Sequence, residues 1–117
     1  ITSLSDARDK TDIKDLSYGL DFIKSLTPRE FTWNNRPEVR VVRDENGNET
    51  EKEIQSKNKG KKDFGFVAQE VQALDNDTLR LIYNSNPEKL EMSYGKLVPI
   101  LVQAVKELTS RLEALEN

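Results

Sequence analysis

A serine and a lysine lie close together near the start of the chain, in the stretch SDARDK, as Ser5 and Lys10. A serine hydroxyl becomes a nucleophile when a base takes its proton, and a lysine can be that base where desolvation or nearby cations favour its neutral form. Lys14 is a second lysine nearby. The sequence contains no histidine and no cysteine, so any catalysis must use Ser, Thr, Lys, Tyr or carboxylates. Disulfides and cysteine or histidine metal sites are excluded.

The spacing of this pair restricts how its side chains can meet. Lys10 follows Ser5 by five positions, whereas one helix face favours separations of three or four and one strand face a separation of two. The pair would therefore meet only across a turn, which the polar sequence SDARDKTD can supply. Spacing alone leaves two interpretations open, a nucleophile with its base and a helix or turn cap at Ser5, and it favours the cap.

Composition limits the kind of protein that presents this pair. With 117 residues, the chain has the length of one domain. Hydrophobic residues make up 35% and charged residues 33%, against about 45–50% apolar residues in typical soluble domains. This balance indicates a domain with much solvated surface, or one that completes its core by associating with copies of itself.

Charge and hydropathy exclude several partners. The net charge of −3 gives no electrostatic case for nucleic acid, and the basic cluster KNKGKK at 57–62 is interpreted as a solvated loop. No apolar run approaches the ~20 residues that a membrane span needs, and the opening ITSL lacks the features of a signal peptide. We expect no nucleic acid, membrane, metal or cofactor as a partner.

The first half of the chain predicts a helix, a strand and a hairpin. Ile13, Leu16, Leu20 and Ile23 recur at helical spacing and predict a helix with one apolar face. This helix ends before Pro28. Alternation in EFTWN places Phe31 and Trp33 on one side of a strand. We expect residues 37–62 to form a projecting hairpin arm, because they are poor in large apolar residues and contain the two-residue turn signal Asn46-Gly47.

The second half predicts further short elements and one long helix. Phe64 and Phe66 indicate a strand, AQEVQAL indicates a helix, and a second hairpin turns at Ser85-Asn86-Pro87. The last helix carries an a/d seam over about three heptads: Tyr94, Val98, Leu101, Val105, Leu108, Leu112 and Leu115. The seam favours self-association over packing on the chain's own sheet, but it does not distinguish a dimer from a trimer. Leu97, Ile100 and Ala104 widen the apolar stripe where this helix should contact its own domain.

Four sequence blocks, taken in order, resemble those of a known protein family. SDARDK, DIKDLSYGLDFIKSLTPREFTW, FGFVAQEV and MSYGKLVPILVQAVKEL follow one another as in the C-terminal intramolecular chaperone domain of bacteriophage endosialidases, tailspikes and L-shaped tail fibres. The myelin regulatory factor family of membrane-tethered transcription factors carries the same self-cleaving domain. The likeness covers nearly the whole chain, with the variable arm at 37–62 between its blocks.

The resemblance implies an α+β fold of small antiparallel strands and short helices, with a long C-terminal helix in a homotrimeric coiled coil. The expected layout is the end of an upstream shaft at 1–4, a globular part at 5–93 and a trimerisation helix at 94–117. The domain would bring the shaft of its own polypeptide into register and then cut itself off. The arm would embrace the folded shaft, the alternative being a disordered loop insertion.

The resemblance also implies roles for single residues. Ser5 would be the nucleophile and Lys10 the base, and the cut would fall between Leu4 and Ser5. Asp6 and Arg8 would have orienting or structural roles. A lining or bracing role is implied for Gln69 and Glu70. Because the chain begins upstream of this bond, it is either an uncleaved precursor, or a product that retains ITSL, or a chain cut elsewhere or not at all.

Three settings remain for such a domain. The expected one is a phage tail fibre or tailspike that assembles in the host cytoplasm, with the domain released from or retained on the virion tail. The second is a structural trimerisation cap without catalytic activity. The third is the transcription-factor version, which is less favoured because no membrane helix follows the heptads before Asn117.

Overall fold

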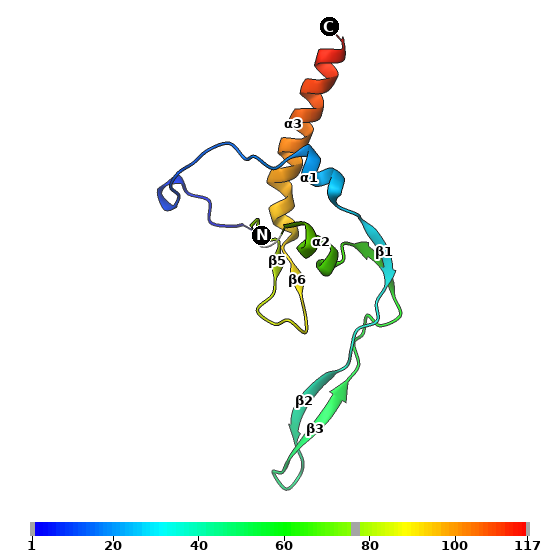
Figure 1. Ribbon diagram of the computed structural model, residues 1–117. Helices are drawn as coiled ribbons and strands as arrows, with labels where there is room; N and C mark the ends of the chain where they lie inside the picture. The colour runs from blue at the N-terminus through cyan, green and yellow to red at the C-terminus, as the bar shows by residue number, and fades with distance from the viewer. Residues whose placement is uncertain (1, 76–77, 117) are drawn as a thin grey trace. The chain divides into compact units, whose positions relative to one another are not determined.

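The computed structural model describes residues 2–75 and 78–116, so the terminal residues of the expected shaft end and trimerisation helix, Ile1 and Asn117, lie outside the described part. The chain divides into two units (Figure 1). One contains the segments up to Leu26 and from Ala68 onward, and the other spans Thr27–Val67. The described strands form two-stranded antiparallel sheets, β1-β4, β2-β3 and β5-β6. This confirms the expected mixed α+β class.

The first unit contains the hydrophobic core. Its helices and strands are η1 (Ala7–Asp9), α1 (Leu20–Ser25), α2 (Ala68–Asp75), β5 (Ile82–Tyr83), β6 (Glu91–Met92), η2 (Tyr94–Lys96) and α3 (Leu97–Glu116). The buried apolar side chains among the described residues are Leu20, Val71, Leu81, Ile82, Leu97, Ile100 and Ala104. Helix α3 packs against α1, and the three positions it buries are those at which the sequence predicts contact with its own domain.

Helix α1 is shorter than the apolar spacing predicts. It begins at Leu20, and the expected first half is not helical, so Ile13 is 73% exposed. The start is set by α3: the Leu20 N–H donates to Glu107 Oε2 at 2.8 Å. Gly19 lies against the same side chain, since a Cβ there would be 2.6 Å from Glu107 Oε1. A tertiary contact, and not a local cap, therefore determines where this helix begins.

The β5-β6 hairpin joins α2 to α3. Ile82 pairs with Met92 and Tyr83 with Glu91, so the expected turn at Ser85-Asn86-Pro87 lies in the connection between the two strands. Beyond the paired residues, the Ser93 N–H donates to the Leu81 carbonyl at 2.7 Å. Leu81 is fully buried, so this end of the hairpin is fixed to the core.

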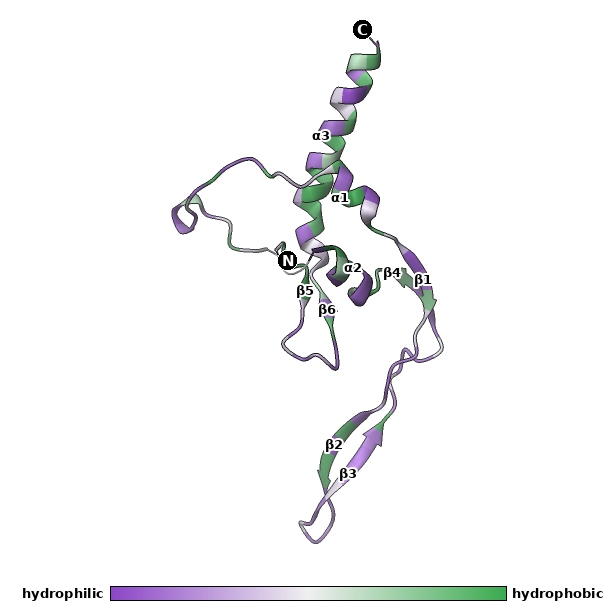
Figure 2. Ribbon diagram, viewed as in Figure 1, coloured by the Kyte–Doolittle hydropathy of each residue, from purple (hydrophilic) through white to green (hydrophobic). Residues whose placement is uncertain are grey.

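The second unit consists of two ribbons. β1 (Arg29–Thr32) pairs with β4 (Lys62–Gly65), and the rings of Phe31 and Trp33 make an edge-to-face contact at 5.0 Å, on one side as predicted. β2 (Glu38–Arg43) pairs with β3 (Glu49–Ile54) to form the arm hairpin. No residue of Thr27–Val67 is buried. Figure 2 shows the valine-rich β2 beside the polar β3.

The turn of the arm differs from the two-residue turn that Asn46-Gly47 predicts. The Gly47 N–H donates to the Asp44 carbonyl at 3.0 Å and the Asp44 N–H to the Asn48 carbonyl at 2.9 Å, so three residues lie in the loop. Of these three residues, Gly47 alone has a positive φ, 78°, as in a type I turn followed by a left-handed residue. The Asp44 carboxylate stabilises this form by accepting from the N–H groups of Asn46 and Asn48, both at 2.9 Å.

Candidate functional site

A single 3₁₀ turn brings Ser5 and Lys10 together. Lys10 Nζ donates a hydrogen bond of 2.9 Å to Ser5 Oγ. Between them η1 spans Ala7–Asp9, and Lys10 is its C-cap, with its N–H donating to the Ala7 carbonyl at 3.1 Å. The separation of five positions, which fits neither a regular helix nor a strand, is thus accommodated by a turn, as the spacing requires.

Asp6 and Arg8 stabilise that turn. Asp6 is the N-cap, and its Oδ1 accepts from the Arg8 N–H at 2.9 Å. The Arg8 guanidinium also donates to the Asp6 carboxylate, with the shortest contact at 2.8 Å. The hydrogen bonds from the Arg8 side chain, and then from its backbone, lower the pKa of the Asp6 carboxyl. Both residues therefore hold the turn and do not contact the Ser5 hydroxyl.

The surroundings of the pair are open. Ser5 and Lys10 are exposed, and Leu4, on the other side of the Leu4–Ser5 bond, is 80% exposed. A Ser5 hydroxyl next to an amine can attack a neighbouring carbonyl carbon, provided that the amine is neutral when it receives the proton. In the single chain, however, both side chains are open to water. A single chain therefore has the short Ser5–Lys10 contact, but it does not shield this contact from water.

Gln69 and Glu70 lie elsewhere in the first unit. They are exposed residues at the start of α2, and Figure 1 shows the green α2 well apart from the dark-blue turn at 7–9. Their role at the site stays a prediction.

The outer face of α3 is apolar and uncovered. All seven seam positions from Tyr94 to Leu115 are at least 45% exposed, although apolar residues of this size are commonly buried. The green residues continue along α3 beyond its contact with α1 (Figure 2). Val102, 55% exposed, extends this face and lines a shallow groove with Val98, Leu101 and Val105. The heptad spacing does not include Val102. Its position next to Leu101 in the sequence could have indicated that it belongs to this apolar face.

Two other kinds of feature are absent from the described part of the chain. No helix there is both long and apolar enough to cross a bilayer. No three acidic side chains between residues 2 and 116, the undescribed pair 76–77 aside, are grouped so as to hold a metal ion.

The sequence was also compared with known proteins. The model of the peptidase S74 family, described as chaperone of endosialidase, matches residues 5–80. The match begins at Ser5 and includes the 3₁₀ turn, α1, the whole second unit and α2. No curated protein and no solved structure matches the chain significantly.

Proposed function

The chain belongs to the peptidase S74 family, the chaperones of endosialidase, and we propose that it trimerises, registers the fibre to which it is fused and releases itself by cutting the Leu4–Ser5 bond. Intramolecular chaperone activity with autoproteolysis by a serine peptidase is the activity of this family. The setting we propose is a phage tail fibre or tailspike that assembles in the host cytoplasm.

The observation that carries the proposal is the 2.9 Å contact between Lys10 Nζ and Ser5 Oγ. In the proposed reaction, neutral Lys10 takes the hydroxyl proton while Ser5 Oγ attacks the Leu4 carbonyl carbon. The tetrahedral intermediate breaks the C–N bond, and Lys10 returns the proton to the departing Ser5 amine. The resulting ester is hydrolysed by water, which gives a Leu4 carboxylate and restores the Ser5 hydroxyl. Attack on the adjacent carbonyl needs no substrate pocket.

Trimerisation is supported by what a single chain leaves exposed. The seven seam residues are at least 45% exposed in the single chain, and a parallel coiled coil would cover them. We propose the homotrimer because the family acts on fibres in which several shafts must be brought into register.

Assembly would also control the timing of the cut. In a single chain Lys10 is exposed, so its ammonium is well hydrated. A neighbouring chain packed over the turn would remove this water and favour the neutral amine that the reaction needs. Gln69 of a neighbouring chain is a candidate for this covering role, whereas the carboxylate of Glu70 placed beside Lys10 would favour the charged ammonium. Cleavage would then follow trimer formation.

The test uses this chain joined to its natural upstream shaft. Intact mass reports cleavage and light scattering reports the oligomer for the wild type, Ser5→Ala and Lys10→Ala, with Lys14→Ala as a matched lysine control. We expect the wild type and Lys14→Ala to split at Leu4–Ser5, and the other two variants to remain whole yet trimeric. A wild-type trimer that never splits would show a non-catalytic trimerisation cap, and a Lys10→Ala chain that splits at the wild-type rate would exclude the dyad.

A further inference from the structure

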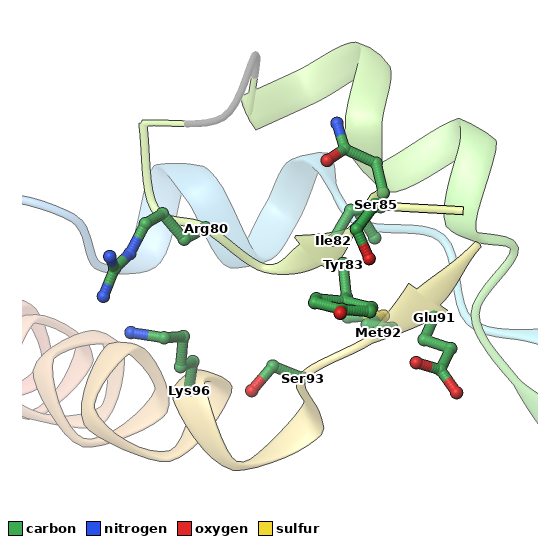
Figure 3. Close-up of a pocket in the computed structure, with 9 residues that line it drawn as sticks. Arg80, Ile82, Tyr83, Ser85, Glu91, Met92, Ser93 and Lys96 are labelled. Atoms are coloured by element: carbon green, nitrogen blue, oxygen red, sulfur yellow. The ribbon is translucent and has the colours of Figure 1, made fainter. Parts of the chain in front are cut away.

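An open pocket lies beside the β5-β6 hairpin, apart from the Ser5–Lys10 turn. Its volume is about 800 Å³. Figure 3 shows this pocket, whose lining includes Arg80, Tyr83, Glu91, Met92, Ser93 and Lys96. The walls therefore combine an apolar floor with two cations, and no step of the proposed cleavage uses them.

The two cations converge on the same end of this pocket. Arg80 precedes β5 and Lys96 ends η2, and their charged groups point toward one another across the opening (Figure 3). The side chains of these two residues form no ion pair or hydrogen bond within residues 2–75 and 78–116. Glu91 lies at the opposite end of the pocket (Figure 3). Both side chains are exposed, and an anion between them would be attracted by both charges.

The backbone fixes the position of Arg80. Its φ is 52°, the left-handed region that a residue with a Cβ seldom adopts. On one side, the Asp75 carboxylate accepts from the Leu79 N–H at 2.8 Å. On the other, Leu81 is fully buried and its carbonyl accepts from Ser93 at 2.7 Å. Strained backbone conformations persist where the surrounding structure enforces them, and they are frequent at ligand sites.

We infer that this pocket binds a tetrahedral oxyanion, a phosphate or sulfate group, between Arg80 and Lys96. The guanidinium can donate two parallel hydrogen bonds to such a group, and the ammonium contributes a point charge. The Ser93 hydroxyl, on the Lys96 side of the pocket in Figure 3, is a further donor. Tyr83 and Met92 form an apolar floor beside the charged end, which would contact the organic part of a phosphorylated or sulfated ligand.

The first experiment titrates the full chain with inorganic phosphate at constant ionic strength and follows its amide resonances by NMR. We expect saturable shifts at Arg80 and at residues 93–96. Arg80→Gln and Lys96→Gln should each weaken binding about ten-fold or more, because each removes a charge-assisted hydrogen bond. Lys52→Gln removes a lysine from strand β3 of the other unit and should leave the affinity unchanged.

A second variant separates binding from folding. Arg80→Gly removes the guanidinium and also relieves the left-handed backbone, so its thermal midpoint should equal or exceed that of the wild type while phosphate binding is lost. If phosphate binds this variant as tightly as the wild type, the inference is overturned. It is overturned as well if chloride produces the same shifts, or if neutralising either cation changes the oligomeric state in phosphate-free buffer, since the pair would then contact an acidic group of another copy.

The nature of the ligand follows from a third titration. A sugar phosphate should bind more tightly than inorganic phosphate if Tyr83 and Met92 contact its organic part, and Tyr83→Ala should remove this difference. If the sugar phosphate and inorganic phosphate bind with equal affinity, the site binds the free ion. Binding is measured independently of cleavage, so neither result depends on the Ser5–Lys10 dyad.

Discussion

The Glu107 carboxylate accepts a hydrogen bond of 2.8 Å from the backbone N–H of Leu20, a residue 87 positions earlier in the chain. The N-terminus of α1 is thus satisfied by a side chain of α3, in place of the local cap that helices commonly have. Gln103 donates to the same carboxylate at 3.3 Å, and Gly19 gives it room to approach. The helix that carries the exposed seam is therefore also the helix that starts α1.

Removing this carboxylate should loosen α1. We expect Glu107→Ala to lower the thermal midpoint and to increase amide exchange at the first turn of α1, because the Leu20 N–H loses its acceptor. Glu113→Ala, on the exposed part of the same helix, is the control and should change neither. Equal exchange in the two variants would show that Glu107 does not determine where α1 begins.

The same carboxylate should make stability depend on pH. Hydrogen bonds from the Leu20 N–H and then from the Gln103 amide, with a smaller effect of the Arg111 charge, lower the pKa of Glu107 from its ordinary value of 4.5. A carboxyl with a lower pKa in the folded state stabilises the fold above its unfolded pKa, and this contribution is lost as the pH falls through the folded pKa. Denaturant unfolding from pH 6 down to about pH 3, across the ordinary range of carboxyl groups, should therefore show a smaller loss in Glu107→Gln than in the wild type.

Asp6 should affect cleavage by positioning the turn. Asp6→Ala removes both the N-cap and the partner of Arg8, so we expect cleavage to slow several-fold. Asp6→Asn keeps an oxygen that can accept from the Arg8 N–H and should retain most of the rate. Single-turnover cleavage followed by intact mass checks this order. If both variants lose all activity while still forming trimers, Asp6 takes part in the chemistry itself.

The exposed face of α3 should determine assembly. Val105→Glu places a charge at an a position, so we expect light scattering to show monomers and cleavage to slow at least ~10-fold, since a charge is strongly disfavoured in a buried seam. Ser110→Glu puts the same charge outside the seam and should remain trimeric and active. A monomeric Val105→Glu chain that cleaves at the wild-type rate would contradict the coupling of assembly to cleavage.

The arm turn gives a prediction about one glycine. Within the three-residue loop at 45–47, Gly47 alone has a positive φ, so Gly47→Val should destabilise the hairpin by about 1–2 kcal/mol, whereas Asn46→Val should be tolerated. Amide exchange at Arg43 and Glu49, which pair at the end of the ladder, reports the effect. A two-residue turn with positive φ at both positions would make the two substitutions equally harmful.

Features built from neighbouring residues could be predicted from the sequence. The meeting of Ser5 and Lys10 across a turn depends on contacts within residues 5–10, all of which are visible in SDARDK. The buried stripe of Leu97, Ile100 and Ala104 follows from helical spacing, which needs no knowledge of the partner. The strand side shared by Phe31 and Trp33 follows from simple alternation.

Features that depend on distant contacts could not be predicted in this way. Ile13 and Leu16 have helical spacing, but α1 begins only where Glu107 meets Leu20. The arm turn is a local feature that was also predicted wrongly: Asn46-Gly47 matches a two-residue turn, but the nearby Asp44 carboxylate favours a three-residue loop. The convergence of Arg80 and Lys96 results from closure of the β5-β6 hairpin and from a left-handed residue, and the sequence carries no spacing signal for either.

The 3₁₀ turn at Ala7–Asp9 has a consequence for synthesis in the cell. The hydrogen bonds that the structure shows for it lie within one hexapeptide, so a nascent chain can form these contacts as soon as residues 5–10 leave the ribosome. An exposed turn of this size is marginally stable by itself, so the reactive geometry would form transiently during translation. Protection from premature hydrolysis would then come from the water that surrounds the lysine, and the loss of that water would commit each finished fibre to maturation.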